Sequence, residues 1–406
     1  MGSLEQPLAL RYHGHQFQVY NPDIGDGRGF LFAQCREQTP PGRLLDFGTK
    51  GTGTTPYSRS GDGRLTLKGA VRELLATTML AAQGVPTSRT FAIFEDRGAN
   101  LYRSDEPSPA RGAVLTRLSH SHIRFGTFQY LAYYKQAEEM ERLVRYALRT
   151  YFDTDETALS VEQAVQLFFG QVVRRTSLTV AAWMMAGFVH GVLNTDNMNV
   201  TGESFDYGPW RWTPTYDGAF IAAYFDHQGL YAYGRQPQAV FWNLQVLASA
   251  LTLVHPNPEP LIDLLKGYSS HLQDATIAQF FWRMGLIPSG DRAADTDLAE
   301  TCLKHLRADQ SPFEDLFYAS ATAQFDLLSA DLKSLLRDWP GVPQSYQKET
   351  MLIEEVESLW APIAAHDDWG PLHEKLTRLD TLYDLRQAWQ APSVQHMETP
   401  NDQFKP

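Results

Sequence analysis

The chain has 406 residues, 43% of them hydrophobic and 20% charged, which is enough to bury a sizeable core in one two-lobed body or in two or three domains. Its formal net charge of −12 argues against nucleic acid as the main partner, because phosphate-backbone binding depends on clustered Lys and Arg. Cys35 and Cys302 are too few for a disulfide framework, and the simplest interpretation is two reduced thiols, with one bridge between them as the alternative.

No segment predicts a membrane anchor or an export signal. The most apolar run, Leu178 to Val189, has 12 residues, whereas a bilayer-spanning helix needs roughly 18 to 20, so a buried helix is expected there. The first residues, Met1 to Gln6, lack the charged and apolar regions of a secretory leader. We therefore expect a cytoplasmic protein with no membrane partner.

Residues 1–118 predict a small β-rich lobe around one helix. Apolar residues recur at helical spacing from Leu67 to Leu80, and Gly84 follows, so this segment is the expected helix. Gly, Pro and Asp clusters separate the expected strands, which are Gln16–Tyr20, Gly29–Gln34, Leu44–Thr49, Arg89–Phe94 and Ala113–Leu118.

Residues 119–390 predict a larger, helical lobe. Helical patterns dominate from about Phe128 onward, and the clearest are Ala137–Tyr151, Val161–His190, Phe241–Val254, Pro260–Leu286 and Ser345–Ala365. Residues 391–406 are polar and contain three prolines, which predicts a flexible tail.

Two glycine-rich turns are candidates for phosphate binding. In Gly25-Asp26-Gly27-Arg28, glycine lets the backbone approach an anion and Arg28 adds a planar donor fork, although a simple tight hairpin is the alternative. Gly61-Asp62-Gly63-Arg64 precedes the first expected helix, whose free N–H groups attract anions. A solvated helix cap is the alternative there.

Four charged residues fit a nucleotide site between the lobes. Lys50 ends an expected strand and Glu73 lies on the following helix, the order in which kinases pair a phosphate-binding lysine with a glutamate. Arg117 and Arg124 flank the lobe junction, where two guanidinium groups could clamp a triphosphate. Surface charges and interlobe salt bridges are the alternatives.

The segment from His190 to Asn197, followed by Asp206-Tyr207-Gly208, resembles the catalytic loop and metal-binding triplet of a protein kinase. In H-R-D-x-x-x-x-N the Asp positions the attacking hydroxyl, and the Asn and the Asp of D-F-G hold magnesium. Here Val192 takes the place of the loop Asp and cannot accept a proton, whereas Asn197 and Asp206 keep oxygen ligands that suit Mg²⁺. The pattern predicts Mg·ATP binding without ordinary kinase chemistry.

A zinc site at His120, His122 and His190 is not expected. No cysteine lies near these histidines, and no carboxylate has a convincing ligand spacing with them.

From about residue 10 to residue 250 the chain resembles the selenoprotein O (SelO) family. The strings that carry the resemblance, in the family's order, are Tyr12-His13-Gly14-His15-Gln16-Phe17, Asn21-Pro22 through Gly25-Asp26-Gly27-Arg28, Lys50-Gly51, Thr55-Pro56-Tyr57-Ser58-Arg59, Gly61-Asp62-Gly63-Arg64, Arg72-Glu73, Ile123-Arg124-Phe125-Gly126, Asn194-Thr195-Asp196-Asn197-Met198, Asp206-Tyr207-Gly208-Pro209 and Asp226-His227-Gln228-Gly229.

The resemblance implies an α+β, protein-kinase-like fold of two lobes. It implies transfer of AMP from ATP to Ser, Thr or Tyr hydroxyls of protein substrates, with ATP bound flipped relative to kinases. Asp196 would be the proton acceptor, and Asn197 and Asp206 would hold Mg²⁺, with Mn²⁺ as the alternative ion. The residues implied to contact ATP are Gly25, Gly27, Arg28, Lys50, Asp62, Gly63, Arg117, Arg124 and Asp206.

The chain departs from the family's pattern at both ends. Family members usually carry a further segment before the string at Tyr12, and many end in a tail with cysteine or selenocysteine. Neither appears in this sequence, so redox control through such a tail is not expected. The resemblance thins after residue 250, which leaves the C-terminal helices as a candidate surface for the protein substrate.

Two other functions compete with AMP transfer. One is phosphoryl transfer by an atypical protein kinase, which needs Asp196 to replace the base that Val192 cannot be. The other is a catalytically inactive, nucleotide-binding pseudokinase that acts as a scaffold.

Overall fold

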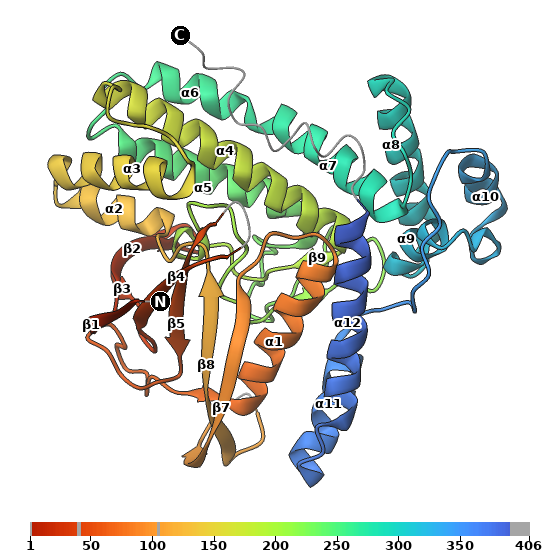
Figure 1. The fold of residues 1–406 in the computed structure, drawn as a ribbon, viewed down its shortest axis with the longest axis horizontal. Helices are drawn as coiled ribbons and strands as arrows, with labels where there is room; N and C mark the ends of the chain where they lie inside the picture. The colour runs from red at the N-terminus through yellow and green to blue at the C-terminus, as the bar shows by residue number, and fades with distance from the viewer. Residues whose placement is uncertain (1, 39–41, 104–105, 390–406) are drawn as a thin grey trace.

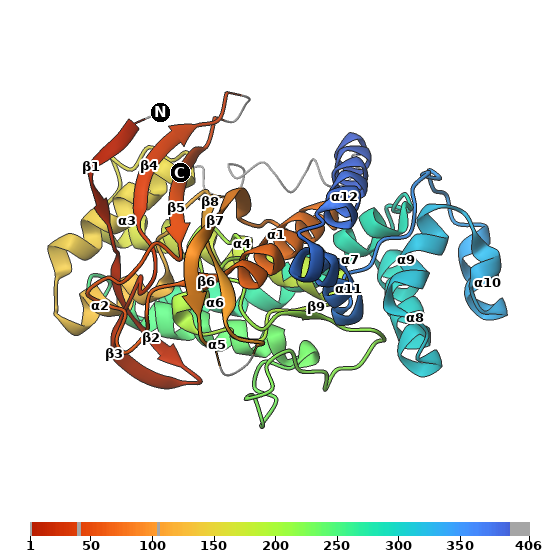
Figure 2. The same ribbon diagram turned by 90° about the horizontal axis from the view of Figure 1, so that it is seen from below.

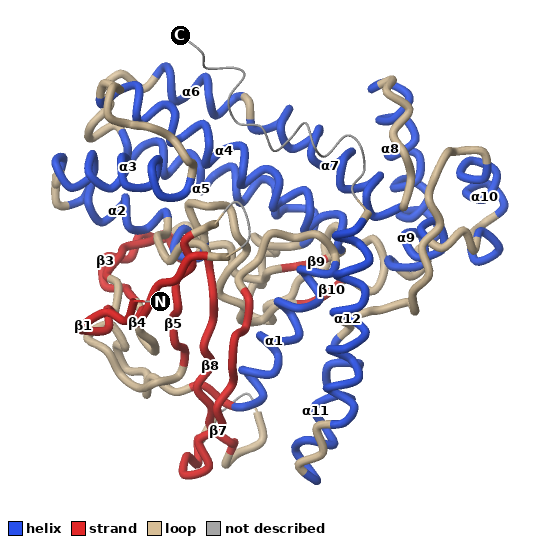
Figure 3. Tube along the Cα trace, viewed as in Figure 1, coloured by secondary structure: helices blue, strands red, loops and turns tan. Residues whose placement is uncertain are grey.

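The computed structural model describes residues 2–38, 42–103 and 106–389, which form an antiparallel β-sheet followed by a mostly helical region (Figure 1). Figure 3 shows the strands gathered on one side of the molecule and most of the helices on the other. The expected α+β composition is confirmed. The expected tail, residues 391–406, lies outside the described residues.

The larger sheet has six strands within the described residues. They run in the order β1, β4, β5, β8 and β6, and β7 also pairs with β8. A separate hairpin is formed by β2 (Arg11–Gln16) and β3 (Val19–Gly25). The strands of the larger sheet are β1 (Gly2–Leu8), β4 (Leu31–Arg36), β5 (Leu44–Lys50), β6 (Leu65–Thr66), β7 (Arg89–Leu101) and β8 (Ala110–Ser119). Four of the expected strands thus exist, as β4, β5, β7 and β8, with shifted ends.

The expected strand Gln16–Tyr20 is wrong, because its centre is the turn of the β2–β3 hairpin. Phe17 and Gln18 have φ angles of +50° and +64°, in the left-handed region that side chains other than glycine rarely adopt. The Phe17 N–H donates to Asn194 Oδ1 at 3.0 Å. A contact with the distant residue Asn194 therefore supports a turn that local sequence does not predict.

The expected helix near residues 67–80 is confirmed as α1 (Leu67–Ala82). Thr66 caps it, since its hydroxyl accepts the Gly69 N–H at 3.1 Å. Leu67 and Ala70 of α1 pack with Ala113 and Leu115 of β8. Glu73 lies on the same helix with its side chain buried. The helix thereby fixes one acidic group beside the end of β5.

The helical region begins after β8. Its helices are α2 (Phe125–Tyr133), α3 (Ala137–Tyr151), α4 (Val161–Ala186), α5 (Gln236–Leu251), α6 (Glu259–Lys266), α7 (Tyr268–Met284), α8 (Arg292–Asp309), α9 (Phe313–Ala321), α10 (Ala330–Arg337), α11 (Ile353–His366) and α12 (Gly370–Ala388).

Three of the expected helices differ from the structure. The helix expected to reach His190 ends at Ala186, because Gly187 adopts φ +68° and the chain then forms β9 (Phe188–Val189), paired with β10 (Arg211–Trp212). The segment Pro260–Leu286 holds two helices, α6 and α7, separated at Gly267. The last expected helix starts only at Ile353. The remaining two are confirmed as α3 and, with shifted ends, α5.

The C-terminal helices α11 and α12 lie beside α1 (Figure 2). Trp360 and Trp369 pack against the small core that joins α1 to the sheet, and Lys68 pairs with Glu357 at 2.7 Å. The last helices thus pack against the core between α1 and the sheet, although they are far from it in sequence. Within the described residues, no helix has both the length and the hydropathy to cross a membrane.

Candidate active site

A cavity of about 740 Å³ lies between the sheet and the helical region, a size within the range of ligand-binding pockets. Both glycine-rich turns line it, together with residues from β5, β8 and the two loops after β9. Asp196 is not among the residues that line it. The predicted site residues that the structure does bring together there are Gly25, Gly27, Arg28, Lys50, Asp62, Gly63, Arg117, Arg124, Asn197 and Asp206.

The two glycine-rich turns pack against the segment that connects them. A Cβ on Gly25 would lie 2.6 Å from the Tyr57 ring, so only glycine fits there without a shift. Gly63 has φ +67°, and a Cβ on it would meet Gly53 at 2.1 Å. The Thr55 hydroxyl donates to the Asp26 carbonyl at 2.6 Å, which ties the segment to the first turn. The turns therefore form one wall of the cavity.

Lys50 and Glu73 form the ion pair expected from their order in the sequence. Lys50 is the last residue of β5 and is 4% exposed, and its ammonium donates to Glu73 on α1. Burial lowers the pKa of Lys50, while Glu73 and Asp206 favour its charged form. The Lys50 Nζ also lies 3.9 Å from Asp206 Oδ1, so the pair reaches the loop that carries the predicted metal ligand.

Asp206 is the acidic side chain that three cationic side chains of the cavity surround. Its carboxylate accepts hydrogen bonds from Arg117 at 2.7 Å and from Arg124 at 3.2 Å. Burial alone would raise its pKa, but the cationic groups of Arg117, Arg124 and Lys50 hold that pKa well below the ordinary value. Asp206 is therefore ionised across the physiological pH range.

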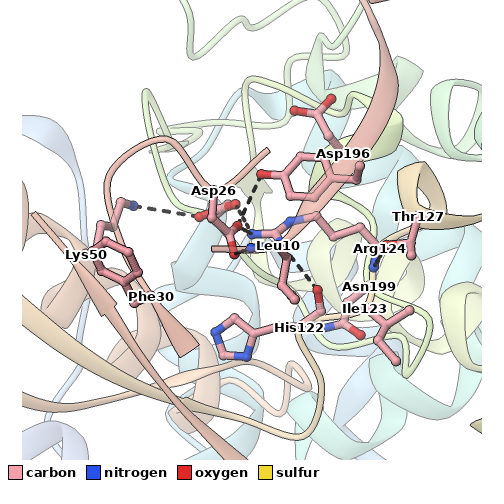
Figure 4. A network of polar contacts seen from close by, with 12 residues as sticks. Leu10, Asp26, Phe30, Lys50, His122, Ile123, Arg124, Thr127, Asp196 and Asn199 are labelled. Atoms are coloured by element: carbon pink, nitrogen blue, oxygen red, sulfur yellow. Dashed lines mark hydrogen bonds and ion pairs between the residues drawn. The ribbon is translucent and has the colours of Figure 1, made fainter. Parts of the chain in front are cut away.

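Arg124 links the first glycine-rich turn to the loop that carries Asp206. Its guanidinium pairs with Asp26 at 3.1 Å as well as with Asp206, and it donates to the His122 carbonyl at 3.1 Å (Figure 4). It also stacks over the Tyr12 ring, with 4.5 Å between the guanidinium carbon and the ring centroid. The interlobe bridge considered for Arg124 thus exists, in a position that also faces the cavity.

Asn197 and Asp206 offer two oxygen donors from neighbouring loops. The Asn197 amide NH₂ donates to the Val192 carbonyl at 2.9 Å, so its carbonyl oxygen stays available as a ligand. No cluster of three or more His, Cys, Asp or Glu side chains in the described part of the chain could hold a metal alone. This donor set fits Mg²⁺, which is bound by few protein oxygens and completes its shell with phosphates and water.

Asp196 lies under the β2–β3 hairpin. Its side chain is almost fully buried, and Gln16 Nε2 donates to its Oδ2 at 3.4 Å. Burial raises the pKa of Asp196 to about 6, and Gln16 and Arg124 only partly oppose that rise. A carboxyl group with this pKa is suited to accept a proton near neutral pH.

Asp26 and Tyr12 belong to the site and were missed as functional residues. Asp26 accepts the Leu10 N–H at 3.1 Å and the Tyr12 hydroxyl at 3.3 Å, in addition to its pair with Arg124. Asp26 stands inside the first glycine-rich motif, which is the signal that could have identified it. No local pattern marks Arg103, which reaches the cavity and pairs with Asp62 at 2.9 Å.

The three histidines considered for zinc make separate contacts. His120 and His190 each donate to a backbone carbonyl at 2.8 Å, and His122 pairs with Asp46 at 3.1 Å. Burial lowers the pKa of all three, so their neutral forms are favoured.

The lining of the cavity is strongly basic, in contrast to the net charge of the chain. Among the described residues, seven basic side chains line it against three carboxylates. The basic residues are Arg28, Lys50, Arg59, Arg64, Arg103, Arg117 and Arg124, and the acidic ones are Asp26, Asp62 and Asp206. Such a surplus suits a polyanionic ligand such as a nucleoside triphosphate.

Comparison with known proteins agrees with this chemistry. A sequence model of the family "Protein adenylyltransferase SelO" matches residues 2–341. The chain is 42% identical over 410 residues to the protein nucleotidyltransferase YdiU of Synechocystis sp., covering 92% of this chain and 85% of that protein. It is 39% identical to the protein of the same name from Gloeobacter violaceus, covering 93% and 83%, and 40% identical to that from Trichodesmium erythraeum, covering 92% and 85%.

Proposed function

The chain belongs to the protein adenylyltransferase SelO family and is a protein nucleotidyltransferase, and on this premise we propose that it transfers AMP from ATP to Ser, Thr or Tyr hydroxyls of proteins. In this proposal residues 1–118 are the smaller lobe of a protein-kinase-like fold and residues 119–390 the helical lobe. ATP and Mg²⁺, or Mn²⁺ in its place, bind in the cavity between them.

The burial of the basic groups carries the proposal. Lys50, Arg117 and Arg124 are 4%, 6% and 1% exposed, so the most enclosed part of the lining is cationic. These groups pair with the carboxylates of Glu73, Asp26 and Asp206. The phosphates of ATP add anionic acceptors that guanidinium and ammonium groups bind strongly, whereas neutral adenine offers them no charge. ATP therefore enters phosphates first, with the β- and γ-phosphates against the buried cations and the α-phosphate left for attack.

The reaction follows from this orientation. The substrate hydroxyl oxygen bonds to the α-phosphorus, the bond from that phosphorus to the oxygen that bridges to the β-phosphate breaks, and pyrophosphate leaves. Asp196 takes the proton of the hydroxyl. Asn197 and Asp206 would hold the divalent cation, which would neutralise the charge that develops on the phosphates. Glu73 keeps Lys50 oriented toward the same phosphates.

Labelled ATP tests the proposal directly. Incubation of the chain with a protein substrate and α-³²P ATP is expected to give covalently labelled protein, whereas γ-³²P ATP is expected to give none. The mass of the modified protein should increase by one AMP. Stable γ-label on Ser, Thr or Tyr would instead show a kinase, and nucleotide binding without either label would show a scaffold.

Arg28→Ala is expected to weaken binding of Mg·ATP about three- to tenfold, with little effect on folding. Arg28 is exposed, and within the described part of the chain it makes no ion pair, yet it lies close enough to Lys50 to lower the pKa of that lysine. Its guanidinium is thus available to a phosphate. Calorimetry with Mg·ATP measures the effect, and adenosine, which lacks phosphates, is the matched ligand. Equal loss of affinity for both ligands would contradict a phosphate contact.

A further inference from the structure

The β2–β3 hairpin is fixed directly on the loop that carries Asp196. The His15 N–H donates to the Thr195 hydroxyl at 2.7 Å, and the Phe17 N–H donates to Asn194 Oδ1 at 3.0 Å. These bonds join residues about 180 positions apart and place β2 over the carboxylate. The side chain between them in sequence, Gln16, is the one that reaches Asp196.

A short relay of hydrogen bonds fixes which end of the Gln16 amide faces Asp196. The relay starts at the Asp23 backbone N–H, which can only donate, and it donates to Asn21 Oδ1 at 2.9 Å. The Asn21 NH₂ therefore faces Gln16 and donates to its Oε1 at 3.2 Å. The remaining Gln16 NH₂ then donates to Asp196 Oδ2 at 3.4 Å, a long separation of the kind that catalytic hydrogen bonds often show before substrate binds.

The second oxygen of Asp196 is left for another partner. Among the described residues, Asp196 Oδ1 is buried and accepts no hydrogen bond. It faces Gly14 of β2, where a Cβ would lie 2.9 Å from Oδ1. A buried carboxylate oxygen without a donor is costly unless a ligand supplies one. The same Cβ would lie 2.8 Å from the Ile24 side chain, so only glycine lets Asp196 lie this close to β2.

We propose that Gln16 is a positioning residue for Asp196, which holds Oδ2 through its amide and leaves Oδ1 to accept the proton of the substrate hydroxyl. The proposal rests on the proposed function, because it assigns the proton transfer to Asp196. Asn21 has a supporting role, because its hydrogen bond to Gln16 Oε1 keeps the Gln16 amide from rotating and exchanging its oxygen and nitrogen. The β2–β3 hairpin is thus part of the region that receives the substrate hydroxyl, in addition to lining the nucleotide cavity.

A double-mutant cycle tests the role of Gln16. Gln16→Met keeps the size of the side chain and removes the amide, and it is expected to lower the rate of AMP transfer about 10- to 100-fold with Mg·ATP affinity unchanged. In the Asp196→Asn background, the same change is expected to have almost no further effect, because the residue through which it acts is already lost. The readouts are α-³²P transfer, Kd for Mg·ATP and Tm.

The outcomes separate this proposal from the proposed function. If Asp196→Asn loses transfer but Gln16→Met works like the parent, Gln16 does not position the base and the proposed function stands. If Gln16→Met lowers the residual rate of Asp196→Asn by the full factor, its role is general packing and the proposal is overturned. If Asp196→Asn transfers AMP like the parent, Asp196 is not the base and the proposal for Gln16 fails, while AMP transfer itself stands. If the parent transfers no α-³²P label, the proposed function fails.

Asn21 provides an independent check of the relay. Asn21→Asp keeps the acceptor for the Asp23 N–H but replaces the donor that faces Gln16 with a carboxylate oxygen. The Gln16 amide is then drawn to turn its NH₂ away from Asp196, so transfer should fall further than in Asn21→Ala, which only frees the amide. Equal rates in the two variants would contradict the relay.

Discussion

Asp206→Asn is expected to lower the rate of AMP transfer by about 10²- to 10³-fold, because a cation ligand that acts in the transition state is worth several kcal/mol. The substitution keeps the shape of the side chain, but it removes the charge and replaces one of the two acceptor oxygens with an NH₂ donor. The shape matters here, since Arg117 and Arg124 both bond to this carboxylate. Rates measured over a range of Mg²⁺ concentrations should show that the variant also needs a higher Mg²⁺ concentration to reach its maximal rate.

The protein is expected to stay folded in Asp206→Asn, with a lower Tm. The low pKa of Asp206 means that its ionised form is bound to the cations of the folded state, so removing the charge removes part of that stability. Glu73 remains 3.7 Å from Arg117, and Asp26 remains 3.1 Å from Arg124, so neither guanidinium is left without an acidic neighbour. An unfolded variant would contradict this account of the charge cluster.

Asp326→Asn is the matched control. Asp326 is an aspartate whose side chain is 91% exposed and pairs with Lys333 on the surface, outside the cavity. Surface ion pairs of this kind contribute little to stability, so both rate and Tm should resemble those of the parent. A parental rate in Asp206→Asn would remove the loop Asp206-Tyr207-Gly208 from the mechanism.

The parts of the site that could be predicted from sequence are those that short local sequence patterns indicate. Lys50 ends a strand and Glu73 lies in a helix with a clear apolar periodicity, so their order alone suggested the ion pair that the structure shows. The glycine-rich turns are similar, because glycine is required where the backbone packs closely on Tyr57 and Gly53. In these segments the local interactions that form the structure are also the ones that produce the sequence pattern.

The parts that could not be predicted depend on contacts between distant segments. Phe17 and Gln18 form a turn with left-handed backbone, but neither residue type favours that conformation, and a bond to Asn194 supports it. Trp360 and Trp369 complete a core that otherwise belongs to residues 65–115. No periodicity near either tryptophan indicates that partner. The C-terminal boundary of the first lobe's core is therefore visible only in the structure.

The position of Asp196 outside the cavity lining was also not predicted from sequence. The resemblance to the SelO family implied that Asp196, next to Asn197, is the proton acceptor. The structure places Asn197 in the cavity wall and Asp196 under the hairpin, because a 3₁₀ turn over Thr195–Asn197 directs successive side chains to different sides. In the proposed function, the substrate hydroxyl and the nucleotide therefore contact different sides of this loop.

Asp196→Asn is expected to lower the rate of AMP transfer by about 10²- to 10⁴-fold, the usual effect of losing a general base, with little change in affinity for Mg·ATP. The amide cannot take the proton of the hydroxyl. Asp196 does not line the nucleotide cavity, so ground-state binding of ATP should not depend on it. Transfer of α-³²P label and calorimetry give the two quantities, and a large loss of ATP affinity would contradict the separation of the two functions.

The free energy of unfolding of Asp196→Asn should exceed that of the parent at pH 8, although its activity is lower. Because burial raises the pKa of Asp196 to about 6, the folded state holds this proton more tightly than the unfolded chain does, and ionisation costs stability as pH rises from about 4 through 6. The neutral amide has no such cost. Asp196→Asn is therefore expected to be more stable than the parent at pH 8, by on the order of 1–3 kcal/mol, and the gain should shrink as pH falls from 6 toward 4. Urea unfolding of both proteins across this range measures the difference, and a variant less stable than the parent at pH 8 would show that the carboxylate is better compensated by its surroundings than its burial indicates.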